Sequence, residues 1–266
     1  MTQSGWLIRD GMRLAIHSGG ADGVPLVLQH GLCGNAGQIA EAMQGLGSQS
    51  WQGLECRGHG ASDLGAEISI AGFAADVAAT IETMAQPVVL GGISLGAAIA
   101  TRLAVTRPDL VRALVLVRPA WIAAKAPPNM QPNSEVGALL ARLSATEARA
   151  AFLDGATARR LKNEAPDNLA SLLGFFDRTP QKATSRLLTT ISADGPGLTE
   201  ADLRGLRLPT LICGTTQDAI HPMSHAETLA RLIPGARLVE LPPKSPDRPA
   251  HLQALAAAMR PFLKET

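Results

Sequence analysis

Aromatic residues are scarce in this sequence and tyrosine is absent, which argues against one large class of partners. Phe, Trp and Tyr together make up 3% of the 266 residues. The formal net charge is +1, and Lys and Arg form no run. Proteins that bind nucleic acids use basic patches and aromatic stacking platforms. We therefore expect no nucleic-acid partner.

Cysteine is scarce as well, and its spacing excludes two kinds of site. Cys33, Cys56 and Cys213 lie far apart, and no Cys-x-x-Cys pair occurs. This spacing indicates neither a disulfide framework nor a zinc knuckle, and a reducing compartment is the simplest interpretation. The glycines form neither a phosphate-binding loop nor a dinucleotide fingerprint. We predict no metal and no cofactor.

Long apolar runs are missing too. Every apolar stretch is interrupted by Gly, Pro or charge before it reaches the roughly 20 residues that cross a bilayer. Residues 1–6 lack the basic region and apolar core of a secretion signal. We expect a cytoplasmic protein with no membrane partner, and the sequence does not indicate its oligomeric state.

Short apolar segments alternate with segments whose apolar residues repeat at helical spacing. Hydrophobic residues make up 46% of the chain, enough for a large core. The predicted strands are residues 13–17, 25–29, 51–55, 87–91, 111–117, 208–213 and 237–241. The predicted helices are residues 38–43, 70–84, 95–107, 223–232 and 249–263. This alternation predicts an α/β fold with a mostly parallel, doubly wound sheet covered on both faces.

One long segment departs from this alternation. Residues 121–203 have helical patterning, Pro and Gly breaks, and no convincing buried strand. The segment is far longer than an ordinary loop. We predict that residues 121–203 form a helical cap on a core made of residues 1–120 and 204–266.

The sequence Gly-Ile-Ser-Leu-Gly at residues 92–96 lies between a predicted strand and a predicted helix. A serine on a sharp, strained strand-to-helix turn needs small residues two positions before and two after it. The helix that begins at Leu95 points its first N–H groups at the serine, where they favour developing negative charge. We therefore predict that Ser94 is a nucleophile. A glycine-rich turn that serves packing alone is the alternative.

A second glycine-rich loop, His-Gly-Leu-Cys-Gly at residues 30–34, follows the strand at 25–29. Its glycines let the backbone pass close to the serine turn. One N–H from such a loop and the N–H of the residue after the nucleophile form an oxyanion hole. We predict Leu32 and Leu95 as these donors, with His30 and Gly31 at the substrate pocket.

These motifs, with residues 57–63 and 214–222, make the chain resemble the α/β-hydrolase fold superfamily, in its single-chain branch with a helical cap. The resemblance covers nearly the whole chain and is weakest in the cap. It implies a catalytic triad in the chain order Ser, Asp, His. Asp218 matches the acid position, on the loop after a late strand. A turn or helix-capping aspartate is the alternative for Asp218.

The histidine of the triad is harder to assign. The resemblance implies a histidine just after the last strand, near Lys244, where none occurs. His251 lies later, in the first turn of the last predicted helix. Two interpretations stay open: His251 reaches Ser94, or it is a partly exposed helix residue. A lysine base at Lys244 is a further alternative. His221 lies close to Asp218 in the sequence, and we expect it to orient that loop.

Arg118 and Trp121 open the predicted cap. We expect both to line the pocket, with Arg118 placed to meet a substrate carboxylate. A surface arginine is the alternative for Arg118.

Together these features predict a serine hydrolase of a small-molecule ester, lactone or related bond, acting by acyl transfer through Ser94. The same fold also serves carbon–carbon hydrolases and lyases. The missing histidine favours a second alternative, a catalytically impaired protein that binds a small ligand. An aspartate nucleophile is excluded because the turn carries a serine.

Overall fold

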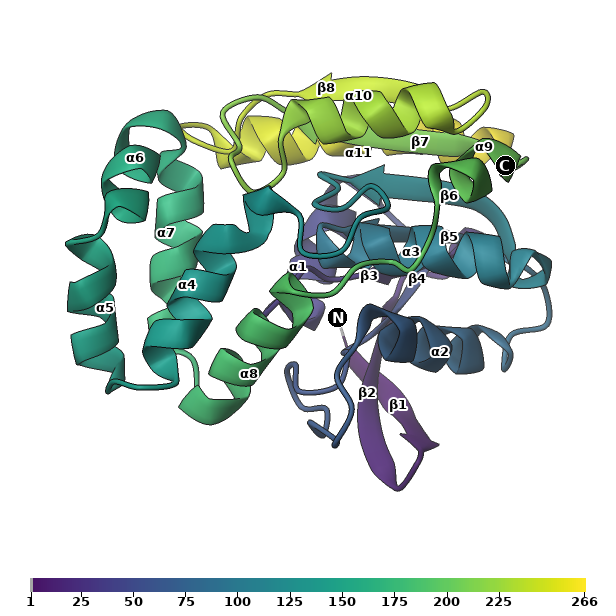
Figure 1. The fold of residues 1–266 in the computed structure, drawn as a ribbon. Coiled ribbons are helices and arrows are strands. Elements are labelled where there is room, and N and C mark those ends of the chain that lie inside the picture. The colour runs from purple at the N-terminus through teal and green to yellow at the C-terminus, as the bar shows by residue number, and fades with distance from the viewer. Residues whose placement is uncertain (1) are drawn as a thin grey trace.

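A computed structural model describes residues 2–266, which form an eight-stranded sheet in the order β1-β2-β4-β3-β5-β6-β7-β8 (Figure 1). The sheet is mostly parallel, and only β1 and β2 run antiparallel to their neighbours. The strands are β1 (Thr2–Arg9), β2 (Met12–Gly19), β3 (Asp22–Gln29), β4 (Gln49–Leu54), β5 (Val88–Ile93), β6 (Val111–Val117), β7 (Thr210–Thr215) and β8 (Arg237–Leu241). This topology confirms the predicted α/β fold.

Helices cover both faces of the sheet. On one face lie α2 (Ile70–Ile81), α3 (Leu95–Thr106) and α10 (Met223–Leu232), and on the other lie α1 (Ala36–Met43) and α11 (Arg248–Glu265). Short 3₁₀ helices are η1 (Gln44–Leu46), η2 (Pro108–Leu110), η3 (Pro128–Met130) and η4 (Phe175–Asp177). This cover on both faces explains why the central strands β5 and β6 are apolar at every position except Arg112, near the start of β6.

Strand β6 shows how the two cores are built. Leu114 and Leu116 pack into the cluster under α2 and α3, whereas Ala113 and Val115 pack into the cluster under α1 and α11. Successive side chains of a strand point to opposite faces, so an uninterrupted apolar run fills both cores at once. The carboxyl end of the strand is thereby fixed, and with it the position of Arg118 directly after it.

A group of helices lies between β6 and β7 in the chain. These are α4 (Gln131–Leu140), α5 (Ala145–Leu153), α6 (Ala156–Glu164), α7 (Pro166–Gly174), α8 (Gln181–Ser192) and α9 (Glu200–Gly205). Helices α4 to α8 lie together at one end of the sheet (Figure 1). Phe152 and Phe176 pack against each other inside this group, with ring centroids 5.8 Å apart. The division into core and cap at residues 121 and 203 stays a prediction.

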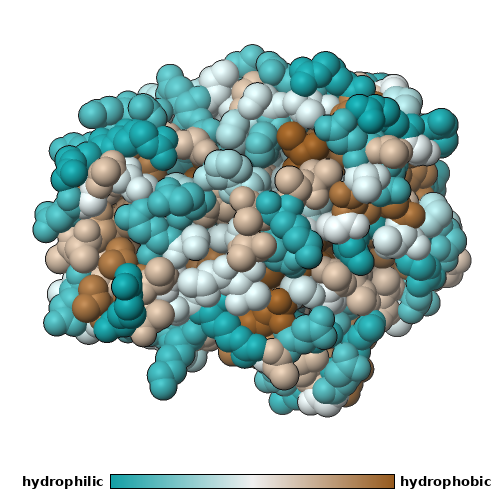
Figure 2. Space-filling view, in the orientation of Figure 1, coloured by the Kyte–Doolittle hydropathy of each residue, from teal (hydrophilic) through white to brown (hydrophobic). Residues whose placement is uncertain are grey.

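The surface is of the ordinary mixed kind on the face shown in Figure 2, where apolar side chains are scattered among polar ones. Within residues 2–266, no helix combines the length and the apolar character needed to cross a membrane.

Candidate active site

Ser94 sits on a strained turn between β5 and α3. Its backbone has φ 58° and ψ −109°, a conformation that residues with a side chain rarely adopt. A Cβ atom on Gly92 would lie 2.0 Å from the carbonyl carbon of Gly96, and one on Gly96 would lie 2.4 Å from the carbonyl oxygen of Gln29. Only glycine fits at either position, which is the steric reason for the motif at residues 92–96.

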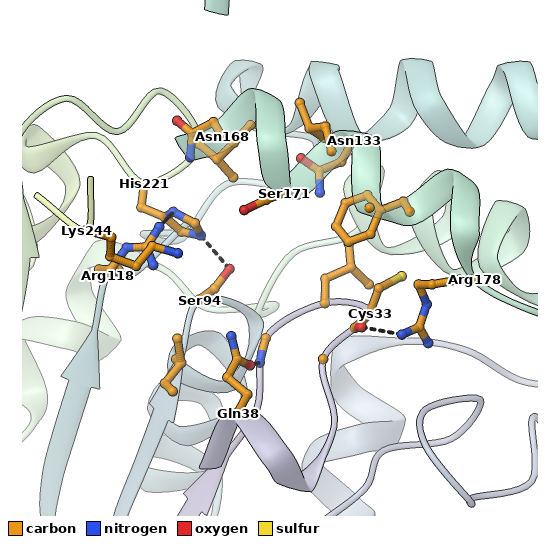
Figure 3. Close-up of a pocket in the computed structure, with 18 residues that line it drawn as sticks. Cys33, Gln38, Ser94, Arg118, Asn133, Asn168, Ser171, Arg178, His221 and Lys244 are labelled. Carbon is orange, nitrogen blue, oxygen red and sulfur yellow. Dashed lines mark hydrogen bonds between the residues drawn. The ribbon is translucent and has the colours of Figure 1, made fainter. Parts of the chain in front are cut away.

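The histidine that reaches Ser94 is His221, on the loop between β7 and α10. Its Nε2 lies 2.8 Å from Ser94 Oγ (Figure 3). Its Nδ1 lies 2.9 and 3.0 Å from the two carboxylate oxygens of Asp218. An ionised carboxylate only accepts hydrogen bonds, so we assign a proton to Nδ1. Nε2 is then free to accept the Ser94 hydroxyl proton. The arrangement is a serine–histidine–aspartate hydrogen-bond chain.

His251, the predicted third member, lies elsewhere. It is buried in the first turn of α11, and its Nδ1 lies 2.7 Å from the carbonyl oxygen of Pro242. The structure therefore does not bring His251 to Ser94. The alternative of a partly exposed helix residue is half right, because the side chain is in the helix but is only 3% exposed. Its ring hydrogen bond ties α11 to the chain leaving β8.

Arg118 is engaged within the protein. Its Nε and Nη2 lie 2.9 and 2.5 Å from Asp218 Oδ2, and the guanidinium is buried. Nη2 also lies 3.1 Å from His221 Nδ1. The guanidinium that was predicted to meet a substrate carboxylate is thus paired with Asp218. Arg118 still forms part of the wall of the cavity beside Ser94.

Asn168 is a site residue that sequence reasoning missed. Its Nδ2 donates to Asp218 Oδ1 at 2.9 Å, and its Oδ1 accepts the N–H of Ala219 at 2.6 Å. Asn168 belongs to α7, so a helix between β6 and β7 holds the loop that carries the acid. The N–H of His221 also donates to Asp218 Oδ1, at 2.9 Å. No local signal marks Asn168, because its partners lie about fifty residues further along the chain.

The electrostatics keep the acid ionised and the histidine neutral. Burial raises the pKa of Asp218, but the charge of His221 when that ring is protonated, the charge of Arg118 and the hydrogen bonds from His221 and Asn168 outweigh burial and hold this pKa well below its usual range. Burial lowers the pKa of His221, Asp218 opposes that effect, and Arg118 lowers the pKa further. A neutral imidazole near pH 7 is the form that accepts a proton.

Leu32 and Leu95, the two predicted oxyanion donors, lie on the two turns that meet at Ser94. The N–H groups on either side of Leu32 are already used, because Gly31 N–H donates to Gln38 Oε1 at 2.7 Å and Cys33 N–H donates to His59 Nε2 at 3.0 Å. Within residues 2–266 the Leu32 N–H has no such partner. Leu95 is the first residue of α3, where N–H groups have no acceptor inside the helix. A Cβ on Gly31 would lie 3.4 Å from Ser94 Cβ, so the two turns are adjacent.

The remaining predicted pocket residues divide into two kinds. Gly31 lines the cavity beside Ser94. His30 is fully buried behind it: its Nδ1–H donates to Gly31 O at 2.8 Å, and its Nε2 accepts from Cys56 N–H at 3.1 Å. Trp121 is buried as well, and its indole N–H donates to Asp194 O at 3.0 Å. Neither His30 nor Trp121 is among the described residues that line the cavity, so the prediction that both line the pocket is wrong.

A cavity of about 340 Å³ opens above Ser94, between the sheet edge and the helices α4 and α7 (Figure 3). Its polar lining includes Gln38, Ser94, Arg118, Asn133, Asn168, Ser171, Arg178, His221 and Lys244, and its apolar lining includes Leu32, Ile93, Leu172, Phe175 and Ile220. Cys33 also lines it, but burial raises the pKa of this thiol to about 12, so it stays protonated. In the part of the chain that the structure describes, no three His, Cys, Asp or Glu side chains form a metal-binding group.

The model of the alpha/beta hydrolase family matches residues 49–258. The chain belongs to this family. A deacetylase of pyrrolizixenacetamide from Xenorhabdus hominickii is 28% identical over 230 residues, which cover 82% of this chain and 83% of that enzyme.

Solved structures of alpha/beta hydrolases share the fold at low identity. A hydrolase from Pseudomonas aeruginosa PA01 has a TM-score of 0.73 and 24% identity, with 97% of each chain covered. The enol-lactonase from Burkholderia xenovorans LB400 has a TM-score of 0.69 and 22% identity, with 98% of this chain and 97% of that one covered. A meta-cleavage product hydrolase from Pseudomonas fluorescens IP01 has a TM-score of 0.75 and 18% identity, with 99% and 98% covered.

In this alpha/beta hydrolase the loop after β8 carries Lys244 where the resemblance implied the histidine. Lys244 lines the cavity, on the same side of Ser94 as His221 and Arg118 (Figure 3). The loop after β7 carries both Asp218 and His221. Sequence reasoning had noted His221 beside Asp218 but expected it only to orient the loop.

Proposed function

We propose that this alpha/beta hydrolase is a serine hydrolase that cleaves a small-molecule ester, lactone or related acyl bond. The observation that carries the proposal is the hydrogen-bond chain from Ser94 Oγ through the His221 ring to Asp218. A serine hydroxyl becomes an effective nucleophile when an adjacent base, itself held by a third group, removes its proton.

The reaction then follows from the positions of these groups. His221 Nε2 takes the hydroxyl proton as Ser94 Oγ forms a bond to the carbonyl carbon of the substrate. The N–H groups of Leu32 and Leu95 donate to the oxyanion that develops. His221 returns the proton to the leaving oxygen or nitrogen as its bond to the carbonyl carbon breaks. Water, deprotonated by His221, then releases the acyl group and restores Ser94.

The helices of residues 121–203 act in this proposal as a cap. Asn168, Leu172 and Phe175 come from these helices and line the cavity above Ser94. A lid of this kind excludes water from the reacting bond and shapes the acyl pocket. Our expectation that the partner is a small molecule rests on the size of this cavity, which is at the small end for ligand sites.

The comparisons support acyl chemistry in particular. The names of two relatives describe cleavage at a carbonyl group, a deacetylase and an enol-lactonase. Carbon–carbon hydrolysis is the nearest alternative, because one neighbour is a meta-cleavage product hydrolase. A catalytically impaired ligand-binding protein was favoured by the missing histidine, and His221 at 2.8 Å from Ser94 removes that reason.

A fluorophosphonate probe, which labels activated serines, tests the proposal together with a screen of 4-nitrophenyl esters and lactones. We expect the wild-type protein to be labelled and to hydrolyse short acyl esters, and Ser94→Ala to lose both properties. Ser224→Ala removes an exposed serine on α10 and is the matched control, expected to react as the wild type does. A wild-type protein that is neither labelled nor active would contradict the proposal.

A further inference from the structure

The cavity beside Ser94 is lined by three cationic side chains, and only one of them has a carboxylate partner. Arg118 pairs with Asp218 at 2.5 Å. Arg178 and Lys244 form no ion pair within residues 2–266, and both line the cavity. No Asp or Glu of the described chain is among the residues that line it. The walls therefore carry positive charge that the protein does not neutralise.

Lys244 is the cation placed to act on a ligand. It is only partly exposed, and burial together with the positive charges of Arg118 and Arg248 lowers its pKa to about 8. The charges of Asp167 and Asp218 oppose this lowering, but within residues 2–266 neither carboxylate forms an ion pair with Lys244. Glu41, on the same wall, is occupied by Arg248, with Nη2 and Oε2 2.5 Å apart. A negatively charged group that binds beside such an ammonium offsets its repulsion from the neighbouring cations.

Arg178 lies on the opposite side of the cavity (Figure 3). Its Nη1 donates to Cys33 O at 2.6 Å, which ties it to the oxyanion loop, and within residues 2–266 its buried Nε has no partner. Arg178 adds to the positive potential of the cavity, but one of its donors already serves the protein. Lys244 has no such engagement within the described chain.

We propose that the substrate carries a carboxylate and that Lys244 binds it. This inference rests on the proposed acyl transfer through Ser94. Lys244 lies on the same side of Ser94 as His221 (Figure 3). Because His221 passes its proton to the leaving atom, the leaving half of the substrate occupies that side. The carboxylate therefore belongs to the leaving alcohol or amine, and a single ammonium matches a single carboxylate in charge.

Two pairs of esters, each matched in shape, test the inference. On the leaving side, 3-acetoxybenzoate is compared with its neutral methyl ester. On the acyl side, the mono-4-nitrophenyl ester of glutarate is compared with 4-nitrophenyl pentanoate. For each pair the measured quantity is the ratio of kcat/KM for the anionic substrate to kcat/KM for the neutral one. We expect the wild-type ratio to be high for the leaving-side pair.

Substitutions of Lys244 then assign that preference. Lys244→Gln is expected to lower the leaving-side ratio about tenfold or more, because the carboxylate loses its counter-charge in a partly desolvated site. Lys244→Arg keeps the charge and should retain most of the ratio. Lys162→Gln removes an exposed charge on α6, away from the cavity, and should leave the ratio at the wild-type value. Lys244 also affects the pKa of His221, and substituting it changes kcat/KM for both substrates of a pair. Taking the ratio of the two values cancels that shared change.

The outcomes separate this inference from the proposed function. A wild-type protein inactive on all four esters contradicts the hydrolase itself. Activity with equal ratios in wild type and Lys244→Gln keeps the hydrolase and overturns the carboxylate site. A preference found only on the acyl side, and lost in Arg178→Gln but not in Lys244→Gln, overturns the assignment to Lys244.

Discussion

The loops after β7 and β8 leave neighbouring parallel strands at the same edge of the sheet and line the same cavity, yet they contribute different groups. The β7 loop supplies Asp218 and His221, whereas the β8 loop supplies Lys244. The resemblance to the superfamily implied an acid on the β7 loop and a histidine on the β8 loop. If His221 is the base that we propose, a catalytic base is defined by its geometry at the nucleophile and not by the strand it follows.

The β7 loop can carry both groups because Asp218 shapes the turn that aims His221. Asp218 Oδ1 accepts the N–H groups of Ile220 and His221 at 3.2 and 2.9 Å, as aspartates do in tight turns. This folds the chain back so that the ring three residues later contacts the same carboxylate. The loop after β8 contains three prolines, Pro242, Pro243 and Pro246, and its aspartate, Asp247, caps α11, where His251 lies.

The largest difference between the two regions is expected when His221 and His251 are each replaced by alanine in separate variants. His221→Ala should lower kcat about 10⁴-fold or more, as loss of a triad histidine does in related constellations. His251→Ala should keep kcat within about threefold, because the lost contact is to Pro242 O and its cost is in stability. Ester hydrolysis and thermal unfolding of both variants measure this. Equal losses of kcat in the two variants would contradict the assignment of the base.

Removing the clamp on the acid should have a smaller effect. Asn168→Ala takes away one donor to Asp218 and leaves the Ala219 N–H without its side-chain acceptor, so we expect kcat to fall about tenfold. Asn163→Ala, on the exposed face of α6, is the control of the same residue type. Steady-state kinetics measure kcat for both variants. An unchanged kcat in Asn168→Ala would contradict the prediction and show that the β7 loop keeps its conformation without Asn168.

The pH dependence gives the finest test. His221 must be neutral to accept a proton, so activity rises as pH increases through its pKa. Burial and Arg118 lower this pKa, so the acid limb of kcat/KM should lie below the ordinary histidine value of 6.5. Arg118→Met removes one lowering charge and should move the limb to higher pH, and Arg118→Lys should move it less. A wild-type limb above 6.5 would contradict the assignment.

The parts of the fold that sequence could predict are those with local signals. The helix at 223–232 and the strand at 237–241 agree with α10 and β8 residue for residue, and the Ser94 turn lies where its glycines indicated. Each rests on periodicity or on a steric demand within a few residues. Strand β1 was missed, because Trp6 and Ile8 are exposed apolar residues at the sheet edge and give no clean alternation.

The parts that sequence could not predict depend on contacts across the chain. Arg118 and Asp218 are one hundred residues apart, and their ion pair follows from the adjacency of β6 and β7 in the sheet. Asn168 reaches Asp218 only because the fold places α7 beside the loop after β7. His251 was predicted to lie at Ser94 in place of His221 because a positional rule taken from the family outweighed a histidine three residues from Asp218.

The placement of His221 has a consequence for how such enzymes are recognised. On the proposed assignment every group that moves a proton precedes Met223. The sequence of β8, of α11 and of the loop between them is then constrained only by packing and by ligand binding. Leu255 and Phe262 of α11 pack in the core, and Lys244 is free to change with the substrate. A search that requires a histidine after the last strand would discard this chain as inactive. The signature to seek instead is a serine turn followed, two strands further on, by Asp-x-x-His.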